Sequence, residues 1–352
     1  MFITGLGTAV PPRRYTQREC WEALQASPHF TGLSIRSRSL VKKVLAAENG
    51  IVSRHLAVDP LADAFDLSPD ALHRRFAVHA PVLAASAARQ ALSQAGLNAC
   101  EVDALIISTC TGYLCPGLTS YVSELLELRP DAICLDLVGH GCGAAVPNLR
   151  AAEALIHGRG VRHALSICVE VCSAAFYLDD DPGVLISACL FGDGAGAAVA
   201  SAESLPGRRS VRLLHSNTIL RPEHRDELRF EQRGGMLRNI LKPTVPKLAS
   251  GTAAALLDET LSQAGRTRED IEAWIWHAGG RDILLALQER LALSESDIRH
   301  SAAVLREYGN ISSPCVFFVL DATLRDNAPG GLWWMSSFGA GFSCHGVLLE
   351  VS

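Results

Sequence analysis

Cys142 stands where a cysteine can act as a nucleophile. The surrounding segment, GHGCGAAVPNLRAAEAL, covers residues 139–155. We expect a strand to end at Val138, a tight glycine turn to hold Cys142, and a helix to follow. The free N–H groups and the dipole at a helix start stabilise a thiolate. The pattern therefore predicts covalent acyl chemistry at Cys142, while a small buried cysteine in a strand–helix joint is the ordinary alternative.

Two other polar side chains stand at comparable junctions. His277 ends the apolar run AWIWH and precedes a glycine turn, and Asn310 comes just before the helix that Ser312-Ser313-Pro314 is expected to begin. A core histidine and a capping asparagine are the ordinary alternatives. A thiolate with two hydrogen-bond donors suits acyl transfer, because the donors stabilise an enolate or oxyanion. His140 is the weaker candidate for a base, because residues so close in a turn seldom present their side chains to each other.

A weak internal repeat organises the chain. LSQAG occurs at residues 92–96 and again at 261–265, an offset of 169, and an apolar strand follows each copy. Adding this offset to Cys142 gives a position one residue from Asn310. The repeat predicts two similar α/β halves, residues 1–200 and 201–352, that face each other across a pseudo-twofold axis. The apolar runs at 104–110, 132–138 and 163–169 are expected to be buried strands. Residues 11–80 interrupt the pattern, as an insertion or lid would.

Composition excludes several classes of protein. Hydrophobic residues make up 48% and charged residues 20% of the 352 positions, and the net charge is −5 without a run of like charges. These values argue for a large core and against nucleic acid as a partner. No apolar run approaches the ~20 residues of a membrane span. With no secretory leader, the eleven cysteines are expected to be reduced thiols of a cytoplasmic protein.

Metal and dinucleotide sites are not expected. No two cysteines have the Cys-x-x-Cys spacing of a zinc site. The glycine-rich segments FGDGAGAAVA (191–200) and FGAGFSCHGVLLE (338–350) each precede a strand and lack the G-x-G-x-x-G pattern that opens a helix. Asp193, between two glycines, is expected to be a hairpin turn residue.

Together these motifs resemble one enzyme family. GCGAA around Cys142, LFGDGA at 190–195, WHAGG at 276–280 and YGNISSPCVFFVLD at 308–321 are similar to the type III polyketide synthases, the chalcone-synthase-like family. The resemblance runs from about residue 80 to the C-terminus. It implies an α/β thiolase fold with a duplicated five-layer αβαβα architecture, a homodimer, and no cofactor beyond coenzyme A thioester substrates.

The resemblance also implies roles for single residues. The catalytic cysteine, histidine and asparagine of the family fall on Cys142, His277 and Asn310, and its gatekeeper phenylalanine falls on Phe191. No aromatic residue stands at 236–241, where a second gatekeeper belongs, and Ala340 replaces a proline in the loop that includes Phe338. Positions that line the cavity in the family fall on Cys110, Cys172 and Ala175, and the dimer contact that reaches the partner's cavity falls on Cys115. Arg38, Lys42 and Lys43 form a basic cluster near the place where the family binds coenzyme A phosphates.

Three candidate functions can be compared with these motifs. The first is a synthase that loads an acyl-CoA starter on Cys142, extends it by decarboxylative condensation with malonyl-CoA and cyclises the product. Small wall residues favour a medium or long aliphatic starter, and therefore an alkylresorcinol or alkylpyrone product. An aromatic starter and a product primed by malonyl-CoA itself are the alternatives. The second is a carrier-protein-dependent enzyme similar to β-ketoacyl carrier-protein synthase III, or an acyltransferase. The third is a non-enzymatic partner subunit, against which the complete triad argues.

Overall fold

Two α/β units share one continuous sheet. The computed structural model describes residues 1–46 and 49–352. The elements of the N-terminal unit are β1 (Phe2–Ala9), α4 (Pro69–Ala95), β4 (Ala104–Ser108), α5 (Leu118–Leu126), β5 (Ile133–Leu137), α6 (Ala145–Arg159), β6 (His163–Glu170) and β7 (Gly194–Ser201). Those of the C-terminal unit are β8 (Val211–Leu220), α8 (Val245–Ala264), β11 (Ile271–Trp276), α9 (Arg281–Leu291), α10 (Glu295–Tyr308), α11 (Cys315–Arg325), β12 (Gly331–Gly339) and β13 (Ser343–Val351).

The strand order is β11-β12-β13-β8-β1-β7-β6-β4-β5. Strand β4 runs parallel to β5 and β6, whereas β7 is antiparallel to both β6 and β1. The C-terminal strands repeat this scheme, with β11 parallel to β12 and β13 antiparallel to β12 and β8. Only Phe2 and Ile3 of β1 pair with β8, so a short seam joins the two units.

The duplication at an offset of 169 is visible in detail. Both α4 and α8 end at a glycine in the left-handed conformation, Gly96 and Gly265. A short 3-10 turn with a capping box follows each, opened by Asn98 in one unit and Thr267 in the other. These repeated turn signals explain why LSQAG recurs, and the duplicated thiolase architecture is confirmed. The division into 1–200 and 201–352, which falls at the last residue of β7, stays a prediction.

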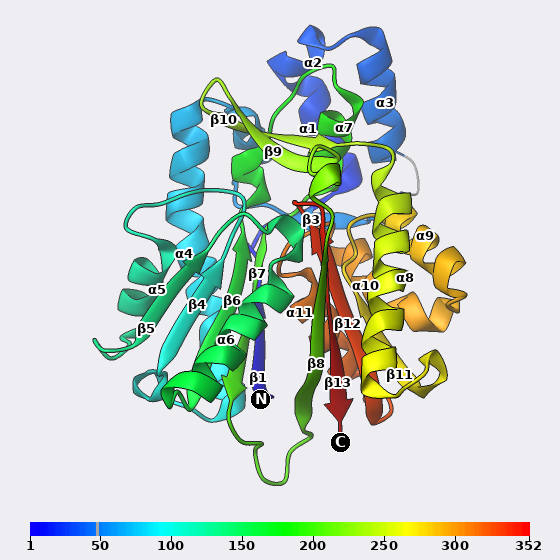
Figure 1. Ribbon diagram of the computed structural model, residues 1–352. Coiled ribbons are helices and arrows are strands. Elements are labelled where there is room, and N and C mark those ends of the chain that lie inside the picture. The colour runs from blue at the N-terminus through cyan, green and yellow to red at the C-terminus, as the bar shows by residue number, and fades with distance from the viewer. Residues whose placement is uncertain (47–48) are drawn as a thin grey trace.

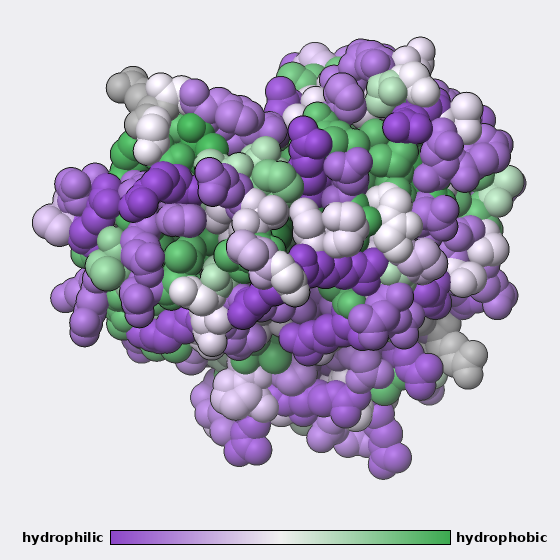
Figure 2. Space-filling model, turned by 90° about the horizontal axis from the view of Figure 1, so that it is seen from below, coloured by the Kyte–Doolittle hydropathy of each residue, from purple (hydrophilic) through white to green (hydrophobic). Residues whose placement is uncertain are grey.

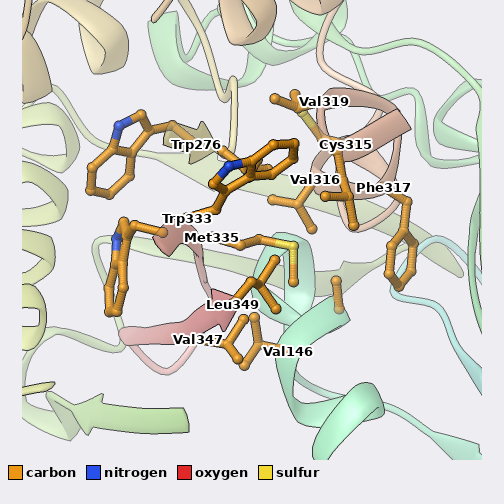
Figure 3. Packing of buried hydrophobic residues seen from close by; sticks show 14 of the residues in the cluster. Val146, Trp276, Cys315, Val316, Phe317, Val319, Trp333, Met335, Val347 and Leu349 are labelled. Carbon is orange, nitrogen blue, oxygen red and sulfur yellow. The ribbon is translucent and has the colours of Figure 1, made fainter. Parts of the chain in front are cut away.

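Five layers result (Figure 1). Helices α4 and α5 cover the outer face of the N-terminal strands, and α8 and α9 lie outside the C-terminal strands. Helices α6 and α11 form the middle layer, because each contacts strands of both units. Figure 3 shows this packing: Val316 of α11 lies near Met335 of β12, and Val146 of α6 lies beside Val347 and Leu349 of β13. Such close packing fixes where α6 and α11 begin, and these two helix starts hold the site.

Smaller elements form a cap over one end of the sheet (Figure 1). Its segments are β2 (Arg14–Thr16), α1 (Gln17–Ala26), α2 (Pro28–Gly32), α3 (Ile35–Ala46), β3 (Ser53–His55), η1 (Leu61–Phe65), η4 (Cys172–Ala175), α7 (Pro182–Leu190), β9 (Leu228–Arg233) and β10 (Met236–Leu241). Leu24 of α1, Val41 of α3 and Leu185 of α7 belong to one buried cluster. The expected insertion at 11–80 is therefore a packed helical cap up to about residue 68, where α4 begins. The opposite end of the molecule is mostly hydrophilic (Figure 2).

One expected strand differs from the prediction. The run 132–138 was expected to be buried, but β5 is the edge strand of the sheet and Leu135 is exposed. Ile133 and Leu137 are partly buried against the main core, whereas Leu135 faces solvent on a sheet edge that a partner can cover.

Candidate active site

Cys142 lies in a 3-10 turn, η3 (Gly141–Gly143), between β5 and α6. Two glycines in this turn permit a close approach by the loop at 339–340. A Cβ on Gly141 would lie 3.0 Å from the backbone nitrogen of Ala340, and one on Gly143 would lie 3.2 Å from that of Gly339. The φ of Gly141 is also +55°, a value that side chains other than glycine rarely adopt. The strand, turn and helix expected around Cys142 are all present.

The Cys142 thiol is buried, with 8% of the residue exposed. Burial raises the pKa of Cys142 to about 12, and the hydrogen bond that Ser312 Oγ donates to its Sγ over 3.2 Å acts in the opposite direction. Burial therefore favours the protonated thiol near neutral pH. We expected a thiolate stabilised by the helix start. The correction is that α6 begins only at Ala145 and that loss of hydration dominates at the sulfur.

Ser312 connects the nucleophile to a buried carboxyl group that the sequence analysis missed. Glu170, at the end of β6, is fully buried, and burial raises its pKa. Its carboxylate accepts hydrogen bonds from Ser313 Oγ at 2.5 Å, Thr111 Oγ1 at 2.8 Å and the Cys110 N–H at 3.0 Å. Ser312 Oγ lies 3.5 Å from the same carboxylate. A single glutamate inside the apolar run HALSICVEV was the available signal.

Ser312-Ser313-Pro314 precedes a helix as expected, but neither serine side chain caps it. Helix α11 has Pro314 at its N-cap position and no side-chain cap bond. The two hydroxyl groups point instead to Cys142 and Glu170, because residues 312–313 lie where the two units meet. Likewise Asp193 is no hairpin turn residue: it is fully buried and accepts hydrogen bonds from the Ala57 N–H and from Ser173.

His277 follows β11, and its backbone N–H donates to Ser336 O at 3.0 Å. The ring is 2% exposed and contacts Phe338 edge to face, with 5.2 Å between ring centroids. Burial lowers the pKa of His277 to about 4, so the imidazole is neutral. Its Nδ1 has no hydrogen-bond partner among the described residues. A neutral ring with a free nitrogen can accept or donate a proton during a reaction.

Asn310 is tied to the turn that carries His277. Its Nδ2 donates to Gly279 O at 3.0 Å, and its Oδ1 accepts the Ser312 N–H at 2.9 Å. The backbone of Asn310 also forms a bridge with Phe191. The side-chain amide of Asn310 therefore links the turn after His277 to the turn at Ser312, and the backbone of Asn310 links both turns to Phe191. The second N–H of the amide has no bond recorded within the described part of the chain.

A pocket of about 40 Å³ lies beside the Cys142 thiol. The predicted wall residues Phe191, Cys110, Cys172 and Ala175 all line it, as do Ser312 and Ala340. Wall residues that the sequence analysis missed are Phe176, Tyr177, Val184, Ser187, Ala188, Leu228, Arg229, Phe230 and Asn239. Phe338 is not among them, because its ring packs against His277 and Phe342.

The hairpin β9–β10 closes the pocket, although residues 236–241 lack the aromatic gatekeeper. Asn239 of β10 and Phe230 of β9 line the wall. The neighbouring Arg238 is held by Asp179 at 2.7 Å, Glu231 at 3.0 Å and Asp181 at 3.2 Å. Hydrogen bonding to Asp179 is the main cause that raises the pKa of Arg238. The hairpin is thus fixed to the segment before α7 by ion pairs.

Four predicted binding residues lie away from this pocket. Cys115 is exposed in the loop before α5. Lys42 and Lys43 are exposed on α3. Arg38, also on α3, donates to the carbonyls of Thr31 and Leu33 and lies over the Phe30 ring.

Neither a metal-ligand cluster nor a membrane-spanning helix is found among the described residues. Within 1–46 and 49–352, no group of three or more His, Cys, Asp or Glu side chains is arranged to hold a metal ion. None of the helices in these ranges combines the length and the apolar character that crossing a bilayer requires.

Comparison with known proteins decides the family. The family model described as "FAE1/Type III polyketide synthase-like protein" matches residues 24–227, more than half of the chain. This chain is a type III polyketide synthase-like protein. The model of the chalcone and stilbene synthase C-terminal domain matches residues 217–351 of the synthase. The chain is therefore an acyltransferase of the condensing type with a thiolase fold, and the resemblance seen in its motifs is confirmed.

Individual relatives agree with this family. The synthase is 29% identical to a protein from Streptomyces toyocaensis named 3,5-dihydroxyphenylacetyl-CoA synthase, over 99% of this chain and 89% of the relative. Among solved structures it resembles PKS-I from the brown alga Ectocarpus siliculosus, with a TM-score of 0.89 and 27% identity over 99% of this chain and 97% of that one. It also resembles 1,3,6,8-tetrahydroxynaphthalene synthase from Streptomyces coelicolor A3(2), with a TM-score of 0.87 and 25% identity over 99% of both chains.

Proposed function

We propose that this synthase loads a short starter thioester on Cys142, extends it with malonyl-CoA and cyclises the chain to a small aromatic product. The observation that supports the proposal best is the pocket itself. The Cys142 thiol lies at one side of a small, mostly apolar space of about 40 Å³, which is walled by Phe176, Tyr177, Phe191 and Phe230. This space suits a short acyl group. The relatives named for a phenolic acyl-CoA product point to the same class.

In the first step, the Cys142 Sγ attacks the thioester carbonyl, a C–S bond forms, and coenzyme A leaves as a thiol. Because burial keeps the Cys142 thiol protonated and the His277 imidazole neutral, we propose that His277 takes the thiol proton as the attack proceeds. The proton then returns to the departing coenzyme A sulfur. The hydrogen bond from Ser312 Oγ stabilises negative charge on Cys142 during the same step.

In the second step, malonyl-CoA loses carbon dioxide and leaves an enolate. We propose that His277 and the free N–H of Asn310 donate to the enolate oxygen. The enolate carbon then attacks the acyl carbonyl on Cys142, the C–S bond breaks, and a β-ketoacyl-CoA forms. Lys42 and Lys43 remain our proposal for coenzyme A phosphate contacts, whereas the guanidinium of Arg38 already serves two backbone carbonyls. The scheme requires no cofactor other than the coenzyme A thioesters.

A longer aliphatic starter is the second candidate, and the chemistry of the wall favours it. Cys110, Cys172, Ala175 and Ala188 present small apolar side chains to the pocket. An apolar wall gains about 0.8 kcal/mol for each methylene it buries. An alkylresorcinol or alkylpyrone would then be the product, provided that the pocket lengthens when the starter binds.

A homodimer is part of the proposal. Several apolar side chains on the β5 side of the molecule are exposed, among them Val78, Val82, Tyr113, Leu135 and Val138. They accompany an unpaired sheet edge, and such surfaces mark protein interfaces. Cys115 lies in the same exposed loop region as Tyr113. Sedimentation equilibrium would give twice the chain mass for wild type, and a lower mass for Leu135→Lys if this face is the contact. The cytoplasmic location stays a prediction.

The decisive experiment is product analysis by mass spectrometry. The purified chain would be incubated with malonyl-CoA alone, and with malonyl-CoA plus acetyl-, benzoyl-, hexanoyl- or dodecanoyl-CoA. We expect a product from malonyl-CoA alone or with acetyl-CoA, and none from Cys142→Ala. A clear preference for dodecanoyl-CoA would instead support the aliphatic candidate, and acceptance of acyl carrier-protein substrates alone would contradict both.

A further inference from the structure

A second apolar cavity, of about 30 Å³, lies behind the wall of the first, inside the cap. It lies between α1, α3, α7 and η1. Its lining includes Leu24, Val41, Leu45, Leu61 and Leu185. These side chains belong to the buried cluster that holds the cap together or pack against it. The cavity thus has the lining of an alkyl-binding site.

Of the residues that the structure describes, Phe176 and Ala188 alone line both cavities. Phe176 follows η4 and is 8% exposed. Its ring packs with Leu56, Val58 and Ala64 in a small apolar cluster. Ala188 contributes one methyl group from α7. Helix α7 also separates the two spaces, because its Val184 and Ser187 line the first and its Leu185 and Cys189 line the second. The ring of Phe176 is therefore the one large side chain shared by the two linings.

One polar side chain, Arg54, lines the second cavity, and it fixes the partition in place. Its Nη1 donates to Ala188 O at 2.8 Å and to Phe191 O at 2.9 Å. These are carbonyls at the C-terminal end of α7, where a cation is favourable. The Nη1 of Arg54 is thus engaged at the end of a helix, while its buried Nε has no hydrogen-bond partner among the described residues. The other side chains of the lining offer a ligand only carbon and sulfur.

We propose that Phe176 sets the upper length of the acyl chain that Cys142 accepts, and that the cavity behind it is a latent binding site for an aliphatic tail. The proposal rests on the acyl-loading function proposed above. With Phe176 in place, the pocket ends at the ring and a short starter fits. Without the ring, the pocket continues into an apolar space of similar size.

The test is the chain-length profile of Phe176→Ala with acetyl-, butyryl-, hexanoyl-, octanoyl- and dodecanoyl-CoA as starters and malonyl-CoA as extender. For each methylene that enters the new space, we expect kcat/KM relative to wild type to rise roughly fourfold. The rise ends where the second cavity is full. Phe176→Leu, which keeps most of the apolar volume, is expected to shift the profile in the same direction by a smaller amount, and it covers the case in which Phe176→Ala does not fold.

Phe65→Ala is the matched control. Phe65 lines the second cavity but not the first, so its loss enlarges the space behind the partition and leaves the partition closed. We expect this variant to keep the wild-type profile. An unchanged profile in both Phe176 variants, or an equal shift in Phe65→Ala, would overturn the inference. If wild type forms no polyketide from any of these thioesters, the proposed function itself fails, which is a separate outcome.

Discussion

The hydroxyl group of Ser312 donates a hydrogen bond to the Sγ of Cys142 across the interface between the two halves of the fold. Ser312 has a φ of +56°, a left-handed conformation that residues other than glycine seldom adopt. Such strain is retained where the surroundings fix it. Its Oγ also lies 3.5 Å from Glu170, so one hydroxyl stands between the nucleophile and a buried carboxyl group. The Ser312 hydroxyl group therefore links Cys142 to Glu170, the residue of the site that the sequence did not predict.

Ser312→Ala is expected to make Cys142 less reactive. Hydrogen bonding from Ser312 lowers the pKa of the thiol, against the larger effect of burial. Its removal raises the pKa further and slows alkylation by iodoacetamide at pH 8 by about tenfold. The rate in both proteins rises with pH, because the thiolate is the reactive form. Ser313→Ala is the control, since Ser313 bonds to Glu170 and not to Cys142. Equal rates in the two variants would contradict the role given to Ser312.

Cys142 is expected to be the residue that a starter thioester acylates. Its position in the glycine turn between β5 and α6, beside the pocket, motivates this assignment. Cys142→Ala should form no acyl-enzyme and no product while keeping its melting temperature. Peptide mapping after a short incubation with the starter would locate the acyl group. Cys110→Ala and Cys172→Ala, which change neighbouring wall thiols, should still be acylated at Cys142, and an acyl group found on either of those cysteines in wild type would refute the assignment.

The triad could be predicted because each member follows a local signal. Cys142, His277 and Asn310 all stand next to glycine turns at strand ends or helix starts, and the 169-residue offset relates the first to the last. The wall residues Phe191, Cys110, Cys172 and Ala175 came from the family resemblance, and all four line the pocket. Short-range patterns of glycine and apolar residues thus predicted the two α/β halves and the strand, turn and helix around Cys142, whereas the thiolase architecture and the wall positions came from the family resemblance. The catalytic roles of Cys142, His277 and Asn310 stay predictions.

The remaining features depend on contacts between distant segments. Glu170 resembles any polar residue at a strand end until Ser313, 143 positions away, bonds to it. Phe176 resembles an ordinary core residue until the cavities on both sides of it are known. The exposure of β5 follows from its place at the sheet edge, which its apolar composition does not reveal. The thiol pKa of Cys142 also reverses the local expectation, because burial depends on the whole fold.

His277→Ala and Asn310→Ala are expected to separate two steps. His277→Ala should slow both acylation of Cys142 and decarboxylation of malonyl-CoA, whereas Asn310→Ala should slow chiefly decarboxylation. Removing one donor to an enolate or oxyanion typically costs ~10²–10³ in rate. Release of carbon dioxide from malonyl-CoA and burst acylation by the starter would be measured separately. A normal decarboxylation rate in Asn310→Ala would remove that residue from the proposed mechanism.

Acid is expected to destabilise the fold through two buried histidines. Burial lowers the pKa of His277 to about 4 and that of His345 to about 3. Their ordinary pKa is 6.5. A histidine whose pKa is lower in the folded than in the unfolded protein stabilises the fold fully at any pH above its unfolded pKa. This stabilisation is lost as the pH falls towards its folded pKa. Between pH 6.5 and 4, each of these histidines costs about 1.4 kcal/mol per pH unit.

His345→Gln tests this argument without altering the triad. His345 exchanges hydrogen bonds with Thr218 Oγ1 at 2.9 Å and Ser343 Oγ at 3.1 Å, and glutamine offers a donor and an acceptor without titrating in this range. Urea denaturation at pH 7, 6, 5 and 4.5 should show that the variant loses less unfolding free energy than wild type below pH 6.5. His157→Gln, at an exposed position on α6, is the control and should keep the wild-type slope. If the slopes of all three proteins coincide, His345 does not cause the acid sensitivity, and the loss comes from other groups whose pKa the fold lowers, such as His277 and Glu19.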